Sequence, residues 1–148
     1  RNILVMEFIS YKGVSGVPAP LIKDEPPEDP ESAYLTIIKY VERAFILGRI
    51  IHADLSEFNI VNTGDELVII DWGSAVKANH PNAVEFLLRD IENVNRYFSR
   101  ELHVEVFDSK ALLNALLRRY EGVDQVMSDE DGWLLIGGKR IIDEVATQ

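Results

Sequence analysis

The sequence predicts a single α+β domain of 148 residues, in which helices pack around a small β-hairpin. In three segments, apolar residues recur every three or four positions, a spacing that is typical of amphipathic helices. Two short segments rich in Ile and Val, 59–61 and 67–70, flank a turn at 62–65 that contains Asn, Gly and Asp. This pattern predicts an antiparallel hairpin. The predicted order of elements is therefore strand, helix, hairpin, helix, helix.

The first predicted strand covers residues 3–9, after which glycines and prolines break the chain into a loop. Because the sequence opens with Arg1 directly before this apolar run, we expect it to be a piece of a larger protein. Asp29 as the N-cap and Pro30 in the first helical position predict a helix that ends at Gly48. Its core-facing stripe is predicted to contain Tyr34, Ile37, Ile38, Val41 and Phe45.

Two further helices are predicted in the second half of the chain. The second helix begins near Pro81, and the third is capped by Asp108 or Ser109 and ends before Gly122. The tail 133–142 is compatible either with a hairpin that turns at its Gly-Gly pair or with a short helix. The residues predicted to face the core are Ala83, Phe86, Leu87, Ile91, Val94 and Phe98 in the second helix and Leu112, Leu113, Leu116, Leu117 and Tyr120 in the third.

Composition excludes several classes of protein. The absence of cysteine excludes disulfide scaffolds, cysteine-ligated zinc and thiol nucleophiles, and it fits a reducing compartment such as the cytoplasm. Fifteen Lys and Arg against 25 Asp and Glu give a formal net charge of −10, which disfavours direct nucleic-acid binding by this chain. No apolar run approaches the ~18 residues of a membrane span. The acidic stretches 24–31 and 129–131 are predicted to be solvated loops.

The polar segment 52–59 and the aspartate that follows the hairpin carry the candidate chemistry. Asp54 and Asn59 have the Asp-x-x-x-x-Asn spacing of a kinase catalytic loop, and Asp71 with Gly73 forms an Asp-x-Gly motif after the hairpin. Phosphoryl transfer needs a carboxylate that orients the attacking hydroxyl and accepts its proton, together with oxygen ligands for magnesium. The ordered set therefore predicts phosphoryl transfer.

Each of these residues also has a purely structural interpretation. His52 is expected to support the loop backbone, Asp71 alone could cap its strand, and Trp72 could belong to the core. A zinc site built on His52 and Asp54 lacks a further ligand at suitable spacing, because the other two histidines lie in different contexts. Only the combination of the motifs, in this order and around a hairpin, favours the catalytic interpretation.

Together these motifs resemble the C-terminal lobe of RIO-type atypical serine/threonine kinases, and they are nearer to the first RIO subfamily than to the second. The resemblance spans roughly residues 3–100. It implies a protein kinase-like C-terminal lobe over 1–148 that begins at the hinge strand, with the N-terminal lobe missing. The segments that carry it are 4–9, 18–24, 52–59, 70–71 and 80–93.

The resemblance implies a site for ATP and magnesium, or manganese in its place. Met6 corresponds to the gatekeeper, and the backbones of Glu7 and Ile9 are implied to bind the adenine edge. Asn59 and Asp71 are implied to hold the metal. The phosphate-binding glycine loop and lysine of such kinases belong to the N-terminal lobe and have no counterpart here, so we expect the chain alone to be inactive.

The resemblance also implies the catalytic residues. Asp54 corresponds to the catalytic base, and His52 belongs to the same loop. For Arg89, Asp90 and Asn93 two interpretations stand: a polar network that braces the second helix against the loop, which we favour, or a direct catalytic role. Trp72 is bulkier than expected in the metal motif, which leaves the local geometry open.

RIO proteins act in maturation of the small ribosomal subunit, as kinases or as ATP-hydrolysing switches. The resemblance therefore implies ATP, a protein substrate of unknown identity and the pre-ribosomal small subunit as partners. One alternative is a small-molecule kinase of the aminoglycoside or choline type, although these usually have Gly at the position of Ala53 and a larger lobe after the metal aspartate. Another is a non-catalytic, nucleotide-sensing module of ribosome assembly.

Overall fold

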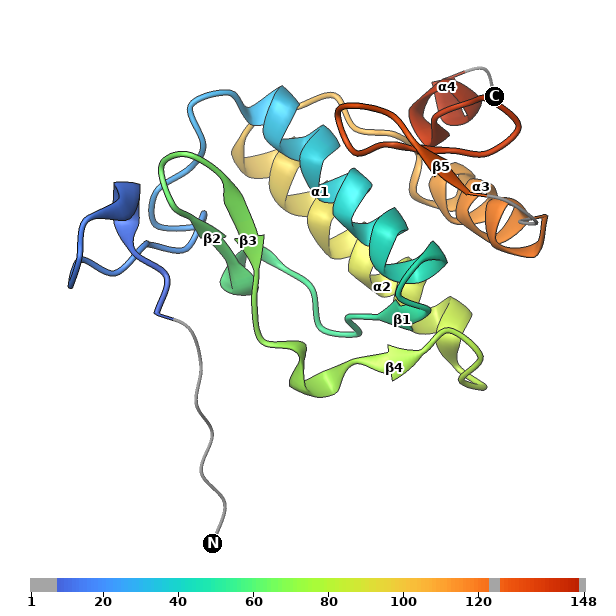
Figure 1. The fold of residues 1–148 in the computed structure, drawn as a ribbon, viewed down its shortest axis with the longest axis horizontal. Helices are drawn as coiled ribbons and strands as arrows, with labels where there is room; N and C mark the ends of the chain where they lie inside the picture. The colour runs from blue at the N-terminus through green and yellow to red at the C-terminus, as the bar shows by residue number, and fades with distance from the viewer. Residues whose placement is uncertain (1–7, 123–125, 147–148) are drawn as a thin grey trace, which may run out of the picture.

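The computed structural model describes residues 8–122 and 126–146 (Figure 1). Helices and three small two-stranded antiparallel sheets alternate along this part of the chain, which confirms the predicted α+β class. The helices are α1 (Pro30–Ile46), α2 (Ala83–Arg96), α3 (Ser109–Glu121) and α4 (Ile141–Ala146). The strands are β1 (Ile50–Ile51), β2 (Ile60–Asn62), β3 (Leu67–Ile69), β4 (Val76–Lys77), β5 (Met127–Ser128) and β6 (Leu134–Leu135).

The predicted first strand lies largely outside the described residues. Of its described part, Phe8 and Ile9 are not in a strand, so the prediction is wrong there. A strand requires a ladder of backbone hydrogen bonds to a neighbour. Here Ala19 N donates to Ile9 O at 2.9 Å, and only an isolated bridge between Ser10 and Pro18 follows.

Helix α1 begins at the predicted proline. The backbone N–H of Ser32 donates to Asp29 Oδ1 at 3.1 Å, which confirms Asp29 as the N-cap. The helix ends at Ile46, two residues before the predicted Gly48. A Cβ at position 48 would lie 2.8 Å from the carbonyl oxygen of Ala44, so the chain can turn away here only because the residue is glycine.

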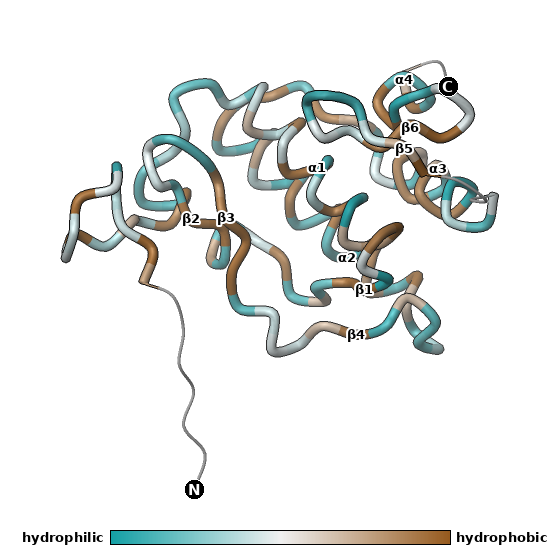
Figure 2. The backbone as a smooth tube through the Cα atoms, viewed as in Figure 1, coloured by the Kyte–Doolittle hydropathy of each residue, from teal (hydrophilic) through white to brown (hydrophobic). Residues whose placement is uncertain are grey.

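The two central strand pairs place the candidate site. In the predicted hairpin, β2 pairs with β3 in the register Ile60↔Ile69, and the turn is closed by a bond from Thr63 N to Glu66 O at 3.0 Å. Strand β1 pairs with β4, a contact that no local pattern in the sequence predicts. Figure 2 shows hydrophobic segments along β1, β2 and β3, and the buried residues Ile51, Ile60 and Leu67 of these strands belong to the same core as those of the helices.

Helices α2 and α3 follow the predicted pattern with small differences. A single π-helical turn, Tyr97–Glu101, extends α2 and carries the fully buried Phe98 into the core. Asp108 caps α3 by accepting from Ala111 N at 2.9 Å. The residues predicted to be buried that are only partly buried are Val41, Phe86, Leu117 and Tyr120. The largest fully buried apolar side chains are Tyr34, Phe45, Phe98, Ile22, Ile37, Leu55, Ile60, Leu87, Ile91, Leu112 and Leu116.

The tail follows neither of the predicted alternatives over 133–142. A hairpin forms between β5 and β6, upstream of the predicted Gly-Gly turn, and α4 follows. Gly137 and Gly138 make only a tight turn with one bridge across it. The acidic stretch 129–131 is more than a solvated loop, because Asp129 accepts from Trp133 N at 3.0 Å and from Arg140 Nε at 2.6 Å. These bonds stabilise the β5–β6 turn.

A buried arginine joins the tail to the helical core. Arg119 on α3 donates from Nε to Glu42 Oε2 on α1 at 2.6 Å, and both side chains are 1% exposed. Its other nitrogens donate to Leu134 O at 2.9 Å and Lys139 O at 3.1 Å. Neither charged residue belongs to a motif that is recognisable in the sequence. No described helix has both the length and the apolar character that a membrane crossing requires.

Candidate active site

The strand pairing brings the loop 52–59 beside the segment that contains Asp71. The loop connects β1 to β2, and the segment around Asp71 connects β3 to β4. Because β1 pairs with β4 and β2 pairs with β3, the two connections run side by side. A backbone bond from Ile70 N to Asn59 O at 2.9 Å joins them. The predicted motifs, 12 residues or more apart in the sequence, therefore meet in one region.

His52 connects the two segments. Its Nε2 lies 2.8 Å from Ile70 O, and its Nδ1 lies 3.2 Å from the backbone nitrogen of Asp54. A carbonyl can only accept and a backbone N–H can only donate, so Nε2 is the donor of this ring and Nδ1 is the acceptor. With 4% of its surface exposed, His52 supports the loop and has no free nitrogen to act as a base.

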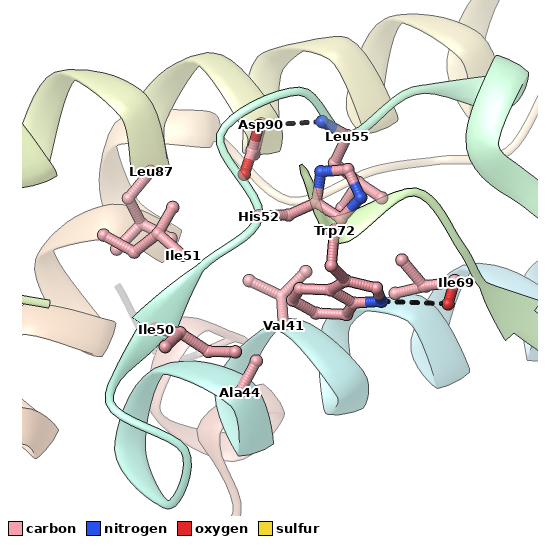
Figure 3. Close-up of a pocket in the computed structure, with 10 residues that line it drawn as sticks. All are labelled: Val41, Ala44, Ile50, Ile51, His52, Leu55, Ile69, Trp72, Leu87 and Asp90. Atoms are coloured by element: carbon pink, nitrogen blue, oxygen red, sulfur yellow. Dashed lines mark hydrogen bonds between the residues drawn. The ribbon is translucent and has the colours of Figure 1, made fainter. Parts of the chain in front are cut away.

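Helix α2 holds the residues on both sides of Asp54. Ala53 N and Leu55 N donate to the two carboxylate oxygens of Asp90, at 2.9 and 3.0 Å. Arg89 donates to Ala53 O at 2.8 Å, and Asn93 donates to Leu55 O at 3.2 Å. Figure 3 shows Asp90 directed at the backbone of Leu55. The predicted bracing network is confirmed, and the Asp54 residue between these anchors remains exposed.

The environment of Asp90 is unusual for a carboxylate. The side chain is 2% exposed, and burial raises its pKa, while the two backbone hydrogen bonds oppose that rise.

The same two hydrogen bonds explain why Ala53 can occupy a left-handed conformation with φ of 70°. Non-glycine residues rarely adopt such a conformation unless the surrounding contacts impose it. The loop geometry is thus set by α2.

Asn59 fixes the far end of the loop. Its Nδ2 donates to Asp54 O at 2.6 Å, and its Oδ1 accepts from Ser56 N at 2.8 Å. The side chain is 4% exposed and closes a capping box with Ser56. An amide oxygen has two lone pairs, so Oδ1 retains one for a metal ion. Its role as a metal ligand stays a prediction.

Asp71 and Trp72 form a sharp turn after β3. Asp71 has φ of 65° and ψ of 58°, a left-handed conformation that aspartate tolerates better than most residues, and it is exposed. The indole of Trp72 donates to Ile69 O at 3.0 Å, and its ring lies 4.8 Å from that of His52. Trp72 is 37% exposed, so it covers His52 at the surface instead of joining the core.

The oxygen donors of this region fit a hard cation such as magnesium. Asp71 supplies an exposed carboxylate and Asn59 a neutral oxygen. Within the described part of the chain, no three His, Asp or Glu side chains converge on a common metal position. Magnesium retains several water or phosphate ligands in many phosphoryl-transfer sites, so a site with few protein ligands suits it.

A small apolar cavity lies beneath the loop. Its volume is about 10 Å³, and Figure 3 shows His52, Trp72 and Asp90 among its walls with aliphatic residues of α1 and β1. A single water needs about that much space, so no nucleotide enters there. Met6 and Glu7 lie outside the described residues, and the role predicted for the Ile9 backbone stays a prediction.

The comparison with protein families decides the assignment. The model of the RIO domain family matches residues 1–112, about three quarters of the chain. The chain belongs to the RIO domain family. The bracing network and both candidate motifs of this RIO chain lie inside the matched residues, whereas β5, β6 and α4 lie beyond them.

Relatives with a RIO kinase name cover much of this chain. Serine/threonine-protein kinase RIO1 of Caenorhabditis elegans is 36% identical over 143 residues, which are 95% of this chain and 26% of the relative. RIO-type serine/threonine-protein kinase Rio1 of Haloferax volcanii is 43% identical over 101 residues, which are 68% of this chain and 33% of the relative. Serine/threonine-protein kinase RIO1 of Homo sapiens is 42% identical over 101 residues, which are 67% of this chain and 17% of the relative. The chain thus spans a third or less of these relatives.

Solved structures of Rio2 kinase from Chaetomium thermophilum are also similar to this chain. The match to one of them covers 60% of this chain and 30% of the Rio2 chain, with a TM-score of 0.49 and 26% sequence identity. The second structure is a Rio2 kinase-ADP/Mg2+-phosphoaspartate complex. The match to it covers 81% of this chain and 40% of the Rio2 chain, with a TM-score of 0.48 and 23% sequence identity.

Proposed function

We propose that this chain is the C-terminal catalytic lobe of a RIO-type serine/threonine protein kinase, and that the complete protein transfers the γ-phosphoryl group of ATP to a protein hydroxyl or to water. The observation that carries the proposal is the exposed Asp54, held between two residues that α2 anchors by four hydrogen bonds. A fixed backbone with a solvent-accessible carboxylate suits a group that must meet an incoming hydroxyl.

In this proposal each residue of the loop has a separate task. Asp54 orients the acceptor hydroxyl and takes its proton as the γ-phosphoryl group leaves ATP. His52 is buried and holds the backbone of Asp54 in place through Nδ1. Asn59 and Asp71 hold the metal ion, which supplies charge neutralisation at the phosphates when bound. Magnesium is the expected ion, and manganese could replace it.

The nucleotide and the partners follow from the family alone. Met6 as the gatekeeper, and the backbones of Glu7 and Ile9, would meet the adenine. The phosphate-binding donors of a kinase lie in an N-terminal lobe, so we propose that the chain by itself does not turn over ATP. Participation in maturation of the small ribosomal subunit, in the cytoplasm, belongs to the same proposal.

A phosphate-transfer assay on the complete protein tests the proposal. With labelled ATP and magnesium, we expect label on a protein acceptor or release of inorganic phosphate, and no turnover by the 148-residue chain used as the control. Label on a small metabolite would indicate a small-molecule kinase. The absence of both transfer and hydrolysis, with nucleotide bound, would support the non-catalytic module instead.

The metal assignment gives a second expected result. In the complete protein, Asp71→Asn should raise the magnesium concentration needed for half-maximal rate by about tenfold or more, because a charged ligand is lost. Its melting temperature should stay near wild type, since Asp71 is exposed. Magnesium titrations of the rate and thermal unfolding provide the two measurements.

Asn59→Ala is the informative comparison. It removes a neutral ligand and, in addition, two partly buried hydrogen bonds that hold the loop. We therefore expect a smaller change in magnesium dependence than for Asp71→Asn, and a loss of about 1–3 kcal/mol in unfolding free energy. If both variants keep the wild-type magnesium dependence, neither residue is a metal ligand.

A further inference from the structure

A second concave surface lies apart from the active-site loop. It is a cleft of about 710 Å³ between the N-terminal segment, the acidic loop, the start of α1 and the β2–β3 turn, segments that lie on one side of the molecule in Figure 1. None of its lining residues belongs to 52–59 or to the turn around Asp71. The volume is in the range of sites that bind ligands or peptide segments.

The walls of the cleft are hydrogen-bonded to one another. Lys12 N donates to Thr63 O at 2.6 Å, which joins the N-terminal segment to the β2–β3 turn. Glu25 of the acidic loop accepts from the Tyr11 hydroxyl at 3.2 Å, and its carbonyl accepts from Asn62 Nδ2 at 3.0 Å. Three segments that are distant in the sequence thus form one preorganised surface, which reduces the cost of ordering it on binding.

The charge of the lining is strongly one-sided. Its two lysines face five carboxylates, which are Glu25, Glu28, Asp29, Asp65 and Glu66. One of the lysines, Lys39, is engaged elsewhere, since it donates to Asp131 O at 2.6 Å and lies over the ring of Trp133. Burial raises the pKa of Tyr40 in the same lining, and the negative charge of Glu66 raises it further.

Apolar surface accompanies this charge. Tyr40 is partly buried and supplies ring surface, and Pro26 and Pro27 form part of the opposing loop. The ring of Tyr11 is already occupied on one face by Lys12, whose Nζ lies 5.4 Å from the ring centroid. Long basic side chains bury their methylene stems against such surfaces while their charged ends reach carboxylates, and arginine also stacks on tyrosine rings. Neither an acidic peptide nor a nucleic-acid backbone would meet complementary charge here.

We propose that this cleft is a docking site for an extended protein segment rich in arginine and lysine, separate from the phosphoryl-transfer site. Docking does not depend on the chemistry at Asp54, so the two proposals fail independently. A partner that docks here leaves the catalytic loop free. Because docking tethers the partner, it raises the effective concentration of the partner at the chain.

The test uses the 148-residue chain and short labelled peptides in fluorescence anisotropy, without nucleotide. An arginine- and lysine-rich peptide is compared with one in which every basic residue is replaced by Glu. The cleft variant combines Glu28→Gln, Asp65→Asn and Glu66→Gln, because no hydrogen bond or ion pair within the described chain uses these three carboxylates.

The control variant has the same change of net charge. It combines Glu101→Gln, Glu105→Gln and Glu121→Gln, three exposed residues outside the cleft. We expect the basic peptide to bind, the acidic peptide not to bind, and the cleft variant to weaken binding about tenfold while the control changes it less than about threefold. Circular dichroism checks that both variants keep the wild-type fold.

Two results would overturn the proposal. If the basic peptide does not bind at low salt, the cleft is not a docking site for such segments. If the cleft variant and the control weaken binding equally, the attraction is a property of the net charge of −10 and not of the cleft. Neither result would bear on phosphoryl transfer, which the labelled-ATP assay measures.

Discussion

Replacing Asp54 by Asn in the complete protein should lower kcat by about 10²–10⁴-fold. Asparagine preserves the size of the side chain but cannot accept the hydroxyl proton and carries no charge to orient the donor. The backbone at this position is held by Ala53 and Leu55 and by the side chains of His52 and Asn59, so the loop should keep its conformation. Steady-state kinetics with saturating ATP provide the measurement, and ATP affinity should change little.

His52→Ala is the matched comparison for this variant. It removes contacts to both Ile70 O and the backbone of Asp54, so we expect it to lower thermal stability as well as rate. Near-wild-type activity of Asp54→Asn would mean that Asp54 is structural, and the kinase proposal would then lose its central residue. A collapse of ATP binding in Asp54→Asn would instead make Asp54 a metal ligand, and the roles of the two aspartates would be exchanged.

Arg119→Met should have the largest effect on stability. The substitution leaves the buried carboxylate of Glu42 without its partner, and breaking a buried ion pair in this way costs about 3–5 kcal/mol. For a chain of this size the corresponding fall in melting temperature is on the order of 10 °C. Chemical and thermal unfolding measure the two quantities. Arg118→Met, on the exposed side of the same helix, is the control and should change stability little.

The loss caused by Arg119→Met should depend on pH. Burial raises the pKa of Glu42, and the Arg119 guanidinium opposes that rise, so removal of the arginine should raise the pKa further. A raised folded-state pKa means that the folded chain is penalised while Glu42 is ionised and relieved once it is protonated. The deficit of the variant should therefore be full at neutral pH and shrink as the pH falls through the folded pKa of Glu42.

A double variant separates the charge from the packing. Combining Arg119→Met with Glu42→Leu removes the unpaired carboxylate, and replacement of a buried ion pair by apolar residues is often close to neutral. We expect this variant to recover much of the lost stability, although the carbonyls of Leu134 and Lys139 lose their donor and Glu144 loses its ion pair with Arg119. If the double variant is no more stable than Arg119→Met, the unpaired charge is not the source of the loss.

Local signals in the sequence were sufficient for much of the fold. The cap of the first helix is predictable as Asp29, and that of the third as Asp108 or Ser109, because a cap depends on a hydrogen bond to a backbone N–H only three residues away. The β2–β3 hairpin was predicted because its turn residues lie between two short apolar runs. The wrong prediction at Phe8 and Ile9 has the opposite cause, since a strand also needs a partner that its own residues do not specify.

The sequence by itself determined which residues could carry chemistry: the spacing of Asp54, Asn59 and Asp71 around a hairpin already predicted phosphoryl transfer. Only the tertiary structure decided that β1 pairs with β4 and so brings the two motifs together, and that Arg119 meets Glu42 across 77 residues of sequence. Spacing and capping act within a few residues and can be read along the chain. Contacts between distant segments depend on how the helices pack, which no short stretch of sequence encodes.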